Sequence, residues 1–210
     1  MRPISIEIVS DWVCPWCYIG KRRLERALQQ RPGLPVTLHW SPFQLSPDMP
    51  PEGRDRAEHY AEIFGPERAR MIIETMRETA RDEGLEFGDR PGARSPNTLL
   101  AHLLMDFAAA QGADATRLAE RLFAAHHVDC EDLGDPAVLQ EIAADCGLDA
   151  EAAAAALASP ERRERVGRQV REMAARGING VPFFVFNGRY AVSGAQPADA
   201  LLQVIDRLAA

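Results

Sequence analysis

The hydrophobic positions of this chain follow two periods, and the period changes twice between the termini. In ISIEIVS every second residue is isoleucine, so Ile4, Ile6 and Ile8 share one face, which predicts a β-strand. Residues 17–30 (CYIGKRRLERALQQ) instead place apolar side chains at helical spacing, before the breaker RPGLP. Alternation returns in residues 36–42 (VTLHWSP), where the closing proline suits a strand end. The N-terminal part therefore predicts strand, helix, strand.

A long middle segment, residues 54–176, has almost only helical periodicity. The predicted helices are 54–64, 66–83, 96–110, 114–128, 136–146, 149–157 and 160–176. Three of their starts look alike, because Ser95-Pro96, Asp135-Pro136 and Ser159-Pro160 each place a capping residue before a proline. Helices of this kind need a shared interior, so the segment is interpreted as one helical insertion.

Strands return near the C-terminus. In PFFVFNGRYAVSG two apolar runs flank Asn187-Gly188, a pair that accepts the positive φ angles of a tight hairpin. The final stretch, QPADALLQVIDRLA, has the apolar stripe of a helix. The predicted fold class is therefore α/β, with one domain built from residues 1–53 and 177–210 and an all-helical insertion at 54–176.

Composition narrows the class of protein. Hydrophobic residues make up 46% of the 210, enough for a core, and the formal net charge of −7 argues against nucleic acid as a partner. No stretch has the length of a membrane span or the pattern of a signal peptide. Only 4 residues are cysteine, too few for a disulfide scaffold. We therefore expect a cytoplasmic protein without a membrane partner, either a monomer or a homodimer.

The pair Cys14 and Cys17 in VCPWCY is the strongest candidate for chemistry. It lies at a predicted strand-to-helix junction, where the helix N-terminus favours a thiolate. We expect Cys14 to be exposed and nucleophilic, and Cys17, one turn further, to attack a mixed disulfide and release the product. Pro15 suits the first helical turn, and Trp16 supplies an apolar rim for the substrate.

Other roles for the cysteines stay open at this point. A zinc site would need two more ligands, such as Cys130 and Cys146 or the neighbouring pair His126-His127, but the chain has no second CxxC. A permanent disulfide is disfavoured in a reducing compartment. Cys130 and Cys146 are interpreted as packed thiols, with a second redox pair as the alternative. Redox exchange is favoured, and no metal is predicted.

Four motifs, taken together, resemble one known family. SDWVCPWCYIGKRRLE, SPNTLLAHLL, LFAAHHVDCEDLGDPAVLQEIAADCGLD and GINGVPFFVFNGRYAVSGAQP look like the FrnE-like branch of the DsbA family, from about residue 4 to residue 208. The resemblance implies a DsbA-like thioredoxin fold with a helical insertion. It also implies a thiol–disulfide oxidoreductase or isomerase with no bound cofactor, in which Cys14–Cys17 is the redox-active disulfide and the substrate is a protein or small-molecule thiol or disulfide.

The same resemblance implies a cis proline that faces the cysteines, and Val181-Pro182 matches its position. A cis peptide bond before proline is accessible and turns the chain sharply. Such a turn would expose the Val181 backbone for strand-like hydrogen bonds to a substrate. Related oxidants often carry histidine where this chain has Trp16, so we hypothesise that its cysteine pair is less oxidising.

Two related branches supply the alternative function. The 2-hydroxychromene-2-carboxylate isomerases and kappa-class glutathione transferases use glutathione, and typically have serine in place of Cys14. Their Ser-Asp pair at the last helix is replaced here by Gly194, Ala195 and Gln196. Backbone N–H groups at this helix start would still suit a carboxylate, so glutathione stays open as a substrate.

Three polar residues complete the candidate site. Asp11, three positions before Cys14, is interpreted either as a proton-transfer group for the buried cysteine or as a turn cap. Asn97 and His102 fall on the predicted 96–110 helix. Because the insertion covers the active site in the family that this chain resembles, we expect these two residues to line the substrate cleft.

Overall fold

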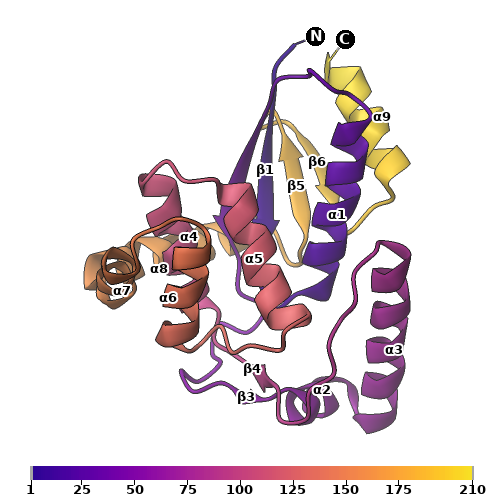
Figure 1. Ribbon diagram of the computed structural model, residues 1–210. Helices are drawn as coiled ribbons and strands as arrows, with labels where there is room; N and C mark the ends of the chain where they lie inside the picture. The colour runs from indigo at the N-terminus through magenta and orange to yellow at the C-terminus, as the bar shows by residue number, and fades with distance from the viewer. Residues whose placement is uncertain (1, 210) are drawn as a thin grey trace.

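The computed structural model describes residues 2–209, and the main sheet of this part has four strands in the order β2-β1-β5-β6 (Figure 1). The strands are β1 (Ile4–Ser10), β2 (Val36–Pro42), β5 (Phe183–Phe186) and β6 (Tyr190–Ser193). β1 is parallel to β2 and antiparallel to β5, and β5 is antiparallel to β6. A parallel pair needs a crossover connection, and α1 (Pro15–Gln29) supplies it.

One face of the sheet is covered by α1 and the C-terminal helix α9 (Ala198–Ala209), which lie side by side (Figure 1). The alternating isoleucines of β1 are at most 2% exposed, as their spacing predicts. They pack with Leu24 of α1, Phe184 of β5 and Ile205 of α9. The period of β1 therefore fixes which side of the strand faces the helices.

Between β2 and β5 the chain forms the helical insertion. Its elements are β3 (Arg54–Asp55), α2 (Arg56–Phe64), α3 (Pro66–Asp82), β4 (Arg94–Ser95), α4 (Leu99–Ala110), α5 (Ala115–His127), α6 (Pro136–Asp145), α7 (Ala150–Ala158) and α8 (Pro160–Ala175). Its largest buried cluster includes Leu103 and Phe123 from the insertion together with Trp12, Cys17 and Tyr18 from around the start of α1. The start of α1 thus lies where the sheet and the insertion share a core.

Ion pairs hold α1 against the insertion. Lys21, only 3% exposed, places its Nζ 2.5 Å from Oε2 of Glu120 on α5. Arg23 Nε lies 2.6 Å from Oε1 of the largely buried Glu83 at the end of α3. Removing one partner of such a buried pair leaves the other charge uncompensated, which is costly. These contacts therefore restrict how α1 can move relative to the insertion.

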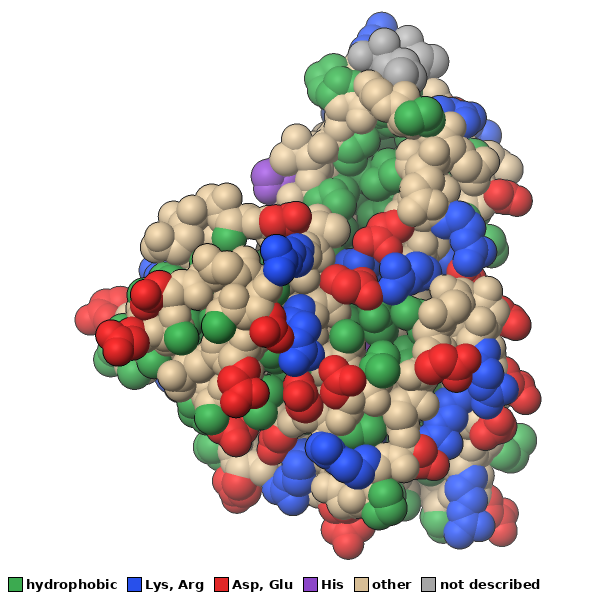
Figure 2. All heavy atoms as spheres, in the orientation of Figure 1, with side chains coloured by type: hydrophobic (Ala, Val, Ile, Leu, Met, Phe, Trp, Pro, Cys, Tyr) green, Lys and Arg blue, Asp and Glu red, His purple; other side chains and the backbone are tan. Residues whose placement is uncertain are grey.

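On the face drawn in Figure 2, basic and acidic side chains are interspersed over the insertion.

The helix boundaries confirm two of the three capping predictions. The side chains of Asp135 and Ser159 accept hydrogen bonds from backbone N–H groups two and three residues ahead, and α6 and α8 begin at the prolines that follow. The third is wrong, because α4 begins at Leu99. Ser95 pairs instead with Arg54 in the short β3–β4 ladder. Strands of two residues have no periodicity, so no pattern in the sequence predicts them.

The predicted hairpin is confirmed. Asn187 has φ of 49° and Gly188 has φ of 66°, both in the left-handed region that the Asn-Gly pair accepts. None of the helices within residues 2–209 has the combination of length and apolar character needed to cross a membrane.

Candidate functional site

The two cysteines lie at the start of α1, as their spacing predicts. Cys14 is the N-cap residue with extended backbone angles, and Pro15 occupies the first helical position. The turn before the helix is closed by a hydrogen bond from Cys14 N–H to the carbonyl of Asp11, at 3.1 Å. Cys17 N–H then donates to the carbonyl of Cys14 at 3.0 Å. Both side chains therefore belong to the first turn, beside free N–H groups of the helix.

Cys14 is less accessible than expected. The prediction that it is exposed is wrong, because its relative exposure is only 4%. Its thiol donates to the carbonyl oxygen of Val181 at 3.6 Å. The Val181-Pro182 peptide bond is cis, as predicted. The fold thus brings a loop from the far end of the sequence against the first cysteine.

Cys17 lies deeper and in a different electrostatic environment. Burial raises the pKa of its thiol well above the usual range, and the neighbouring Cys14 raises it further. The Ser10 hydroxyl acts in the opposite direction and lowers this pKa. Ser10 is itself buried, and within residues 2–209 its hydroxyl makes no hydrogen bond within the usual limits. Sequence reasoning missed Ser10, because a serine at a strand end has many ordinary roles.

The cis-proline loop packs closely on α1. A Cβ atom added to Gly20 would lie 2.9 Å from Cγ of Pro182, so only glycine allows this approach. Pro182 is held from the other side, where its carbonyl accepts the N–H of Gly194 at 2.8 Å. The residue after that glycine, Ala195, accepts a hydrogen bond from Arg23 at 2.5 Å. The close contact therefore fixes the loop next to Cys14.

The stretch before α9 was expected to offer backbone N–H groups to a carboxylate. The structure uses one of them internally, because Gln196 N–H donates to the carbonyl of Gly194 at 2.9 Å. Gln196 also folds its side chain back onto the carbonyl of Ser193. Gly194, Ala195 and Gln196 lie behind the cis proline and are not part of the pocket lining described next.

A pocket of about 390 Å³ opens beside Cys14, and we call it the cysteine pocket. The predicted substrate-binding residues Pro15, Trp16 and Val181 line it. Most of the remaining wall is apolar, with side chains from the loop after β2 and from α2 and α3: Leu45, Met49, Tyr60, Ile63, Phe64 and Ile72. Among the described residues, no lysine or arginine is part of this lining. The pocket therefore suits an uncharged, apolar group next to the reactive sulfur.

Asp11 also lines the cysteine pocket and is only 1% exposed. Its Oδ2 accepts the N–H of Leu45 at 2.7 Å, while Oδ1 has no hydrogen-bond partner within residues 2–209. The nearest imidazole nitrogen, His102 Nε2, lies 3.7 Å from Oδ1. The structure thus contains both features that the sequence left open: a carbonyl that closes the turn and a carboxylate with one oxygen free.

Asn97 and His102 are not on the lining of the cysteine pocket, contrary to expectation. Asn97 donates to the carbonyl of Met49 at 2.6 Å and accepts the N–H of Leu99. Trp12 Nε1–H donates to Nδ1 of His102, so Nε2 carries the proton and donates to the carbonyl of Phe43 at 2.9 Å. Both residues hold the loop after β2 from behind, because their polar atoms are already used there.

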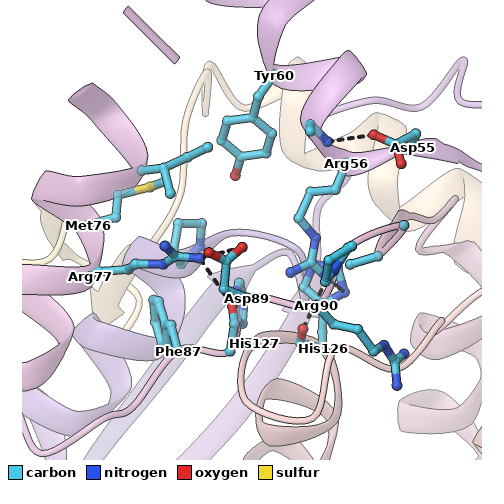
Figure 3. Close-up of a pocket in the computed structure, with 17 residues that line it drawn as sticks. Asp55, Arg56, Tyr60, Met76, Arg77, Phe87, Asp89, Arg90, His126 and His127 are labelled. Carbon is cyan, nitrogen blue, oxygen red and sulfur yellow. Dashed lines mark hydrogen bonds and ion pairs between the residues drawn. The ribbon is translucent and has the colours of Figure 1, made fainter. Parts of the chain in front are cut away.

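A second, smaller pocket of about 170 Å³ adjoins the first, and we call it the arginine pocket (Figure 3). The two pockets share Pro15, Tyr60, Met76 and His126. Burial raises the pKa of Tyr60 to about 12, with a further contribution from Cys14. Sequence reasoning missed this wall, because its residues come from amphipathic helices and from the loop 87–93, and neither carries a motif.

The other two cysteines are not bonded to each other. Cys130 is buried and Cys146 is partly exposed, and both are free thiols, as are Cys14 and Cys17. Within residues 2–209, no group of three or more histidine, cysteine or acidic side chains is arranged to hold a metal ion. The four cysteines thus form one close pair at α1 and two separate thiols in the insertion.

Comparisons with known proteins agree with this architecture. A family model described as DSBA-like thioredoxin domain matches residues 5–206. SCO1869 of Streptomyces coelicolor, described as a probable DsbA oxidoreductase, is 32% identical, with a TM-score of 0.87 over 97% of this chain and 89% of that chain. The uncharacterized protein YwbO of Bacillus subtilis (strain 168) is 27% identical over 96% of both chains.

A more distant structure shares the fold alone. The cytosolic disulfide reductase DsbM from Pseudomonas aeruginosa, solved with GSH, is 21% identical, with a TM-score of 0.65 over 97% of this chain and 98% of that chain. Together with the family match, these comparisons confirm the α/β, DsbA-like thioredoxin fold with a helical insertion that the motifs imply.

Proposed function

We propose, for a chain that belongs to the DSBA-like thioredoxin domain family, that Cys14 and Cys17 carry out thiol–disulfide exchange on a substrate bound in the cysteine pocket. One observation carries the proposal: the Cys14 sulfur lies on the pocket wall against the Val181 carbonyl, beside the cis Pro182. A thiol in this position meets a substrate that enters the pocket, and an adjacent second thiol is ready to complete the exchange.

The exchange takes two displacement steps. The Cys14 thiolate attacks one sulfur of a substrate disulfide, forms a mixed disulfide and releases the first substrate thiolate. Cys17 then attacks the Cys14 sulfur, forms the Cys14–Cys17 disulfide and releases the second thiolate. The substrate gains two electrons and the cysteine pair loses two, and the reverse sequence oxidises a dithiol substrate. The raised pKa of Cys17 keeps it protonated until its turn, so this step needs a proton acceptor.

Asp11 is the proposed proton acceptor for Cys17. Its carboxylate is buried, lines the same pocket and has one oxygen without a hydrogen-bond partner among residues 2–209. The Asp11 backbone also lowers the pKa of Cys17, and the turn before α1 joins Asp11 to Cys14. A carboxylate that is free to accept a proton next to a high-pKa thiol fits general-base chemistry.

Substrate binding is assigned to the pocket wall. Pro15 and Trp16 give an apolar surface beside the sulfur, and the Val181 backbone is the proposed strand-like partner of a peptide or small thiol. Asn97 and His102 are proposed to act indirectly, by positioning the loop after β2. Glutathione is retained as a candidate small-molecule substrate, and the cytoplasm as the proposed compartment.

The alternative, a glutathione-dependent isomerase or transferase, is less well supported. That chemistry typically places serine where this chain has Cys14, and it needs no second thiol. Here both positions are cysteines, and the second one is buried next to the first. Such a transformation would persist without Cys17, whereas disulfide exchange requires it.

Reduction of insulin and reactivation of scrambled ribonuclease test the proposal. We expect Cys14→Ser to reduce either activity to the uncatalysed background, because the attacking thiolate is gone. Cys146→Ser is the matched control, since it removes a partly exposed thiol from the insertion, and it should retain activity. Activity that survives Cys14→Ser would show that the exchange mechanism is wrong.

A further inference from the structure

The arginine pocket differs in charge from the cysteine pocket that it adjoins. Its lining includes three arginines, Arg56, Arg77 and Arg90, whereas the described lining of the cysteine pocket has no basic side chain other than two histidines. Pro15 and Tyr60 belong to both linings, so the two spaces meet one residue from Cys14. A molecule whose sulfur reaches Cys14 can therefore extend into a region of different polarity.

Two of the three arginines, Arg77 and Arg90, already have partners within the fold. Arg77 pairs with Asp89, with Nη2 2.8 Å from Oδ1, so these two charges neutralise each other. Arg90 donates from Nη2 to the carbonyl of Cys130. Within residues 2–209, Arg56 has no carboxylate at ion-pair distance. Within residues 2–209, Arg90 likewise has no carboxylate at ion-pair distance, so Arg56 and Arg90 are the two cations of this pocket that no carboxylate pairs with, and the Arg56 guanidinium points into the cavity (Figure 3).

The Arg56 side chain is held in place by neutral groups. Its Nη2 donates to the carbonyl of His126 at 3.1 Å, and Nε and Nη2 lie 3.3 Å from the carbonyl of Arg94. The nearest carboxylate along the chain, Asp55, caps α2 by accepting the N–H groups of Ala57 and Glu58. These contacts orient the guanidinium without neutralising it, and within residues 2–209 they leave Nη1 without a hydrogen-bond partner.

Two histidines beside Arg56 are uncharged near neutral pH, whereas Asp89, which pairs with Arg77, is a carboxylate whose pKa Arg56 also lowers. Burial lowers the pKa of His126 well below its usual range, and lowers that of His127 to about 3, with Arg56 contributing to both shifts. The Tyr60 hydroxyl points into the cavity from α2, as does the Arg56 guanidinium (Figure 3). With its raised pKa, Tyr60 remains a neutral O–H donor. The Arg56 cation and the Tyr60 hydroxyl donor therefore face the same space, alongside the Arg77–Asp89 ion pair.

We propose that the arginine pocket binds a carboxylate of the substrate, held by Arg56 and Tyr60, while the sulfur of the same molecule meets Cys14. The substrate class is then a small anionic disulfide or thiol. This inference rests on the proposed exchange at Cys14 and adds a charge requirement to it. Guanidinium groups suit carboxylates because they offer charge and parallel N–H donors together.

Two aromatic disulfides of similar shape and different charge can test this subsite. Dithiobis(nitrobenzoate) carries a carboxylate on each ring, and dithiodipyridine is neutral. With either probe, Cys14 attacks the S–S bond and releases one coloured aromatic thiolate, and Cys17 then releases the second. The probe takes two electrons from the cysteine pair. The rate of colour release is measured for each probe, in a Cys146→Ser background of the full chain so that the partly exposed thiol does not contribute.

The expected result is a selective loss with the anionic probe. Arg56→Gln should lower its rate constant about tenfold and change that of the neutral probe by less than about twofold. Arg56→Lys should recover part of the loss, because it restores the charge. Arg54→Gln is the matched control: this arginine lies two residues away, is half exposed and pairs with Glu62, so it should change neither rate.

Different failures have different meanings. Equal losses with both probes, or no loss with either, would overturn the carboxylate subsite while leaving exchange at Cys14 intact. If Arg56→Gln does not fold, Tyr60→Phe removes only the hydroxyl and should still selectively slow the anionic probe. If the neutral probe is not reduced through Cys14 at all, the proposed exchange itself fails.

Discussion

The four cysteines occupy two regions of the molecule that give the thiols different surroundings. Cys14 and Cys17 share one helical turn, and Cys14 lies on a pocket against the Val181 carbonyl. Cys130 and Cys146 lie in the insertion, one buried and one partly exposed, and neither lines the cysteine pocket. Burial alone does not separate them, because Cys14, Cys17 and Cys130 are all at most 4% exposed.

The difference lies in what surrounds each thiol. At α1 a second thiol is within one turn, a carboxylate with a free oxygen lines the same pocket, and the pocket gives a substrate access to the sulfur. In the insertion, burial raises the pKa of Cys146, so a smaller fraction of this thiol is ionised at neutral pH. Reactivity in this protein is therefore attributed to a partner thiol and an access route, rather than to exposure.

The largest expected effect separates the two members of the active pair. In Cys17→Ser the first attack by Cys14 proceeds, but no neighbouring thiol releases the product, so a mixed disulfide accumulates. Turnover should fall by at least about a hundredfold, because an intramolecular step is replaced by attack from solution. Intact-mass measurement after incubation with a disulfide substrate should show one added substrate thiol per chain.

Cys146→Ser is the control for that experiment, and it should neither trap substrate nor lose turnover. Normal turnover in Cys17→Ser would contradict the proposed difference between the two regions. A trapped adduct that mapped to Cys130 or Cys146 would contradict it as well.

A smaller effect, on the free energy of unfolding, should appear on acidification. It comes from the segment that leads to Cys130. His127 is buried at the end of α5, and its Nε2 lies 3.1 Å from the carbonyl of Trp12, beside the active turn. Its folded pKa of about 3 is below the unfolded value of 6.5, so folding favours the neutral ring. This contribution is fully present above pH 6.5 and is lost as the pH falls toward 3, by roughly a few kcal/mol at most.

Thermal unfolding from pH 8 to pH 4 would measure this loss. His127→Gln keeps a side-chain N–H donor but does not titrate, so the variant should lose less stability over the same range. Identical pH profiles for the wild type and the variant would contradict the assignment.

The smallest expected effect concerns how oxidising the active pair is. Trp16→His places a titratable cation beside the Cys14 thiolate, which should stabilise the reduced form and raise the reduction potential by about 30 mV. Trp16→Gln is the uncharged control and should shift the reduction potential less. Equilibration with glutathione buffers gives the potential. A wild-type value near −120 mV, typical of a strong oxidant, would contradict the hypothesis that the pair is less oxidising.

Local patterns predicted those parts of the site that depend on residues close in sequence. The period of β1, the Asn187-Gly188 turn and the spacing of Cys14 and Cys17 each carry their own physical reason. The cis peptide bond at Val181-Pro182 was implied by the family resemblance rather than by a local pattern. The α4 start was wrong, because Ser95 is used in a two-residue ladder that has no sequence pattern.

The remaining parts depend on tertiary contacts that no single segment encodes. The burial of Cys14 follows from the loop at Val181 folding over it, and His102 faces Phe43 and Trp12 rather than the pocket. Arg56 and Tyr60 occupy ordinary positions of an amphipathic helix, so only the fold reveals that they face a cavity next to Cys14.

The most direct test of the account is a redox titration of the full chain in glutathione buffers, with alkylation and mass spectrometric mapping of all four cysteines. The account predicts that Cys14 and Cys17 are lost from the alkylated pool together, in one two-electron transition that yields a Cys14–Cys17 disulfide. Cys130 and Cys146 should remain alkylatable thiols throughout. A bond between Cys130 and Cys146, or a Cys14–Cys17 pair that stays reduced in fully oxidising buffer, would contradict it.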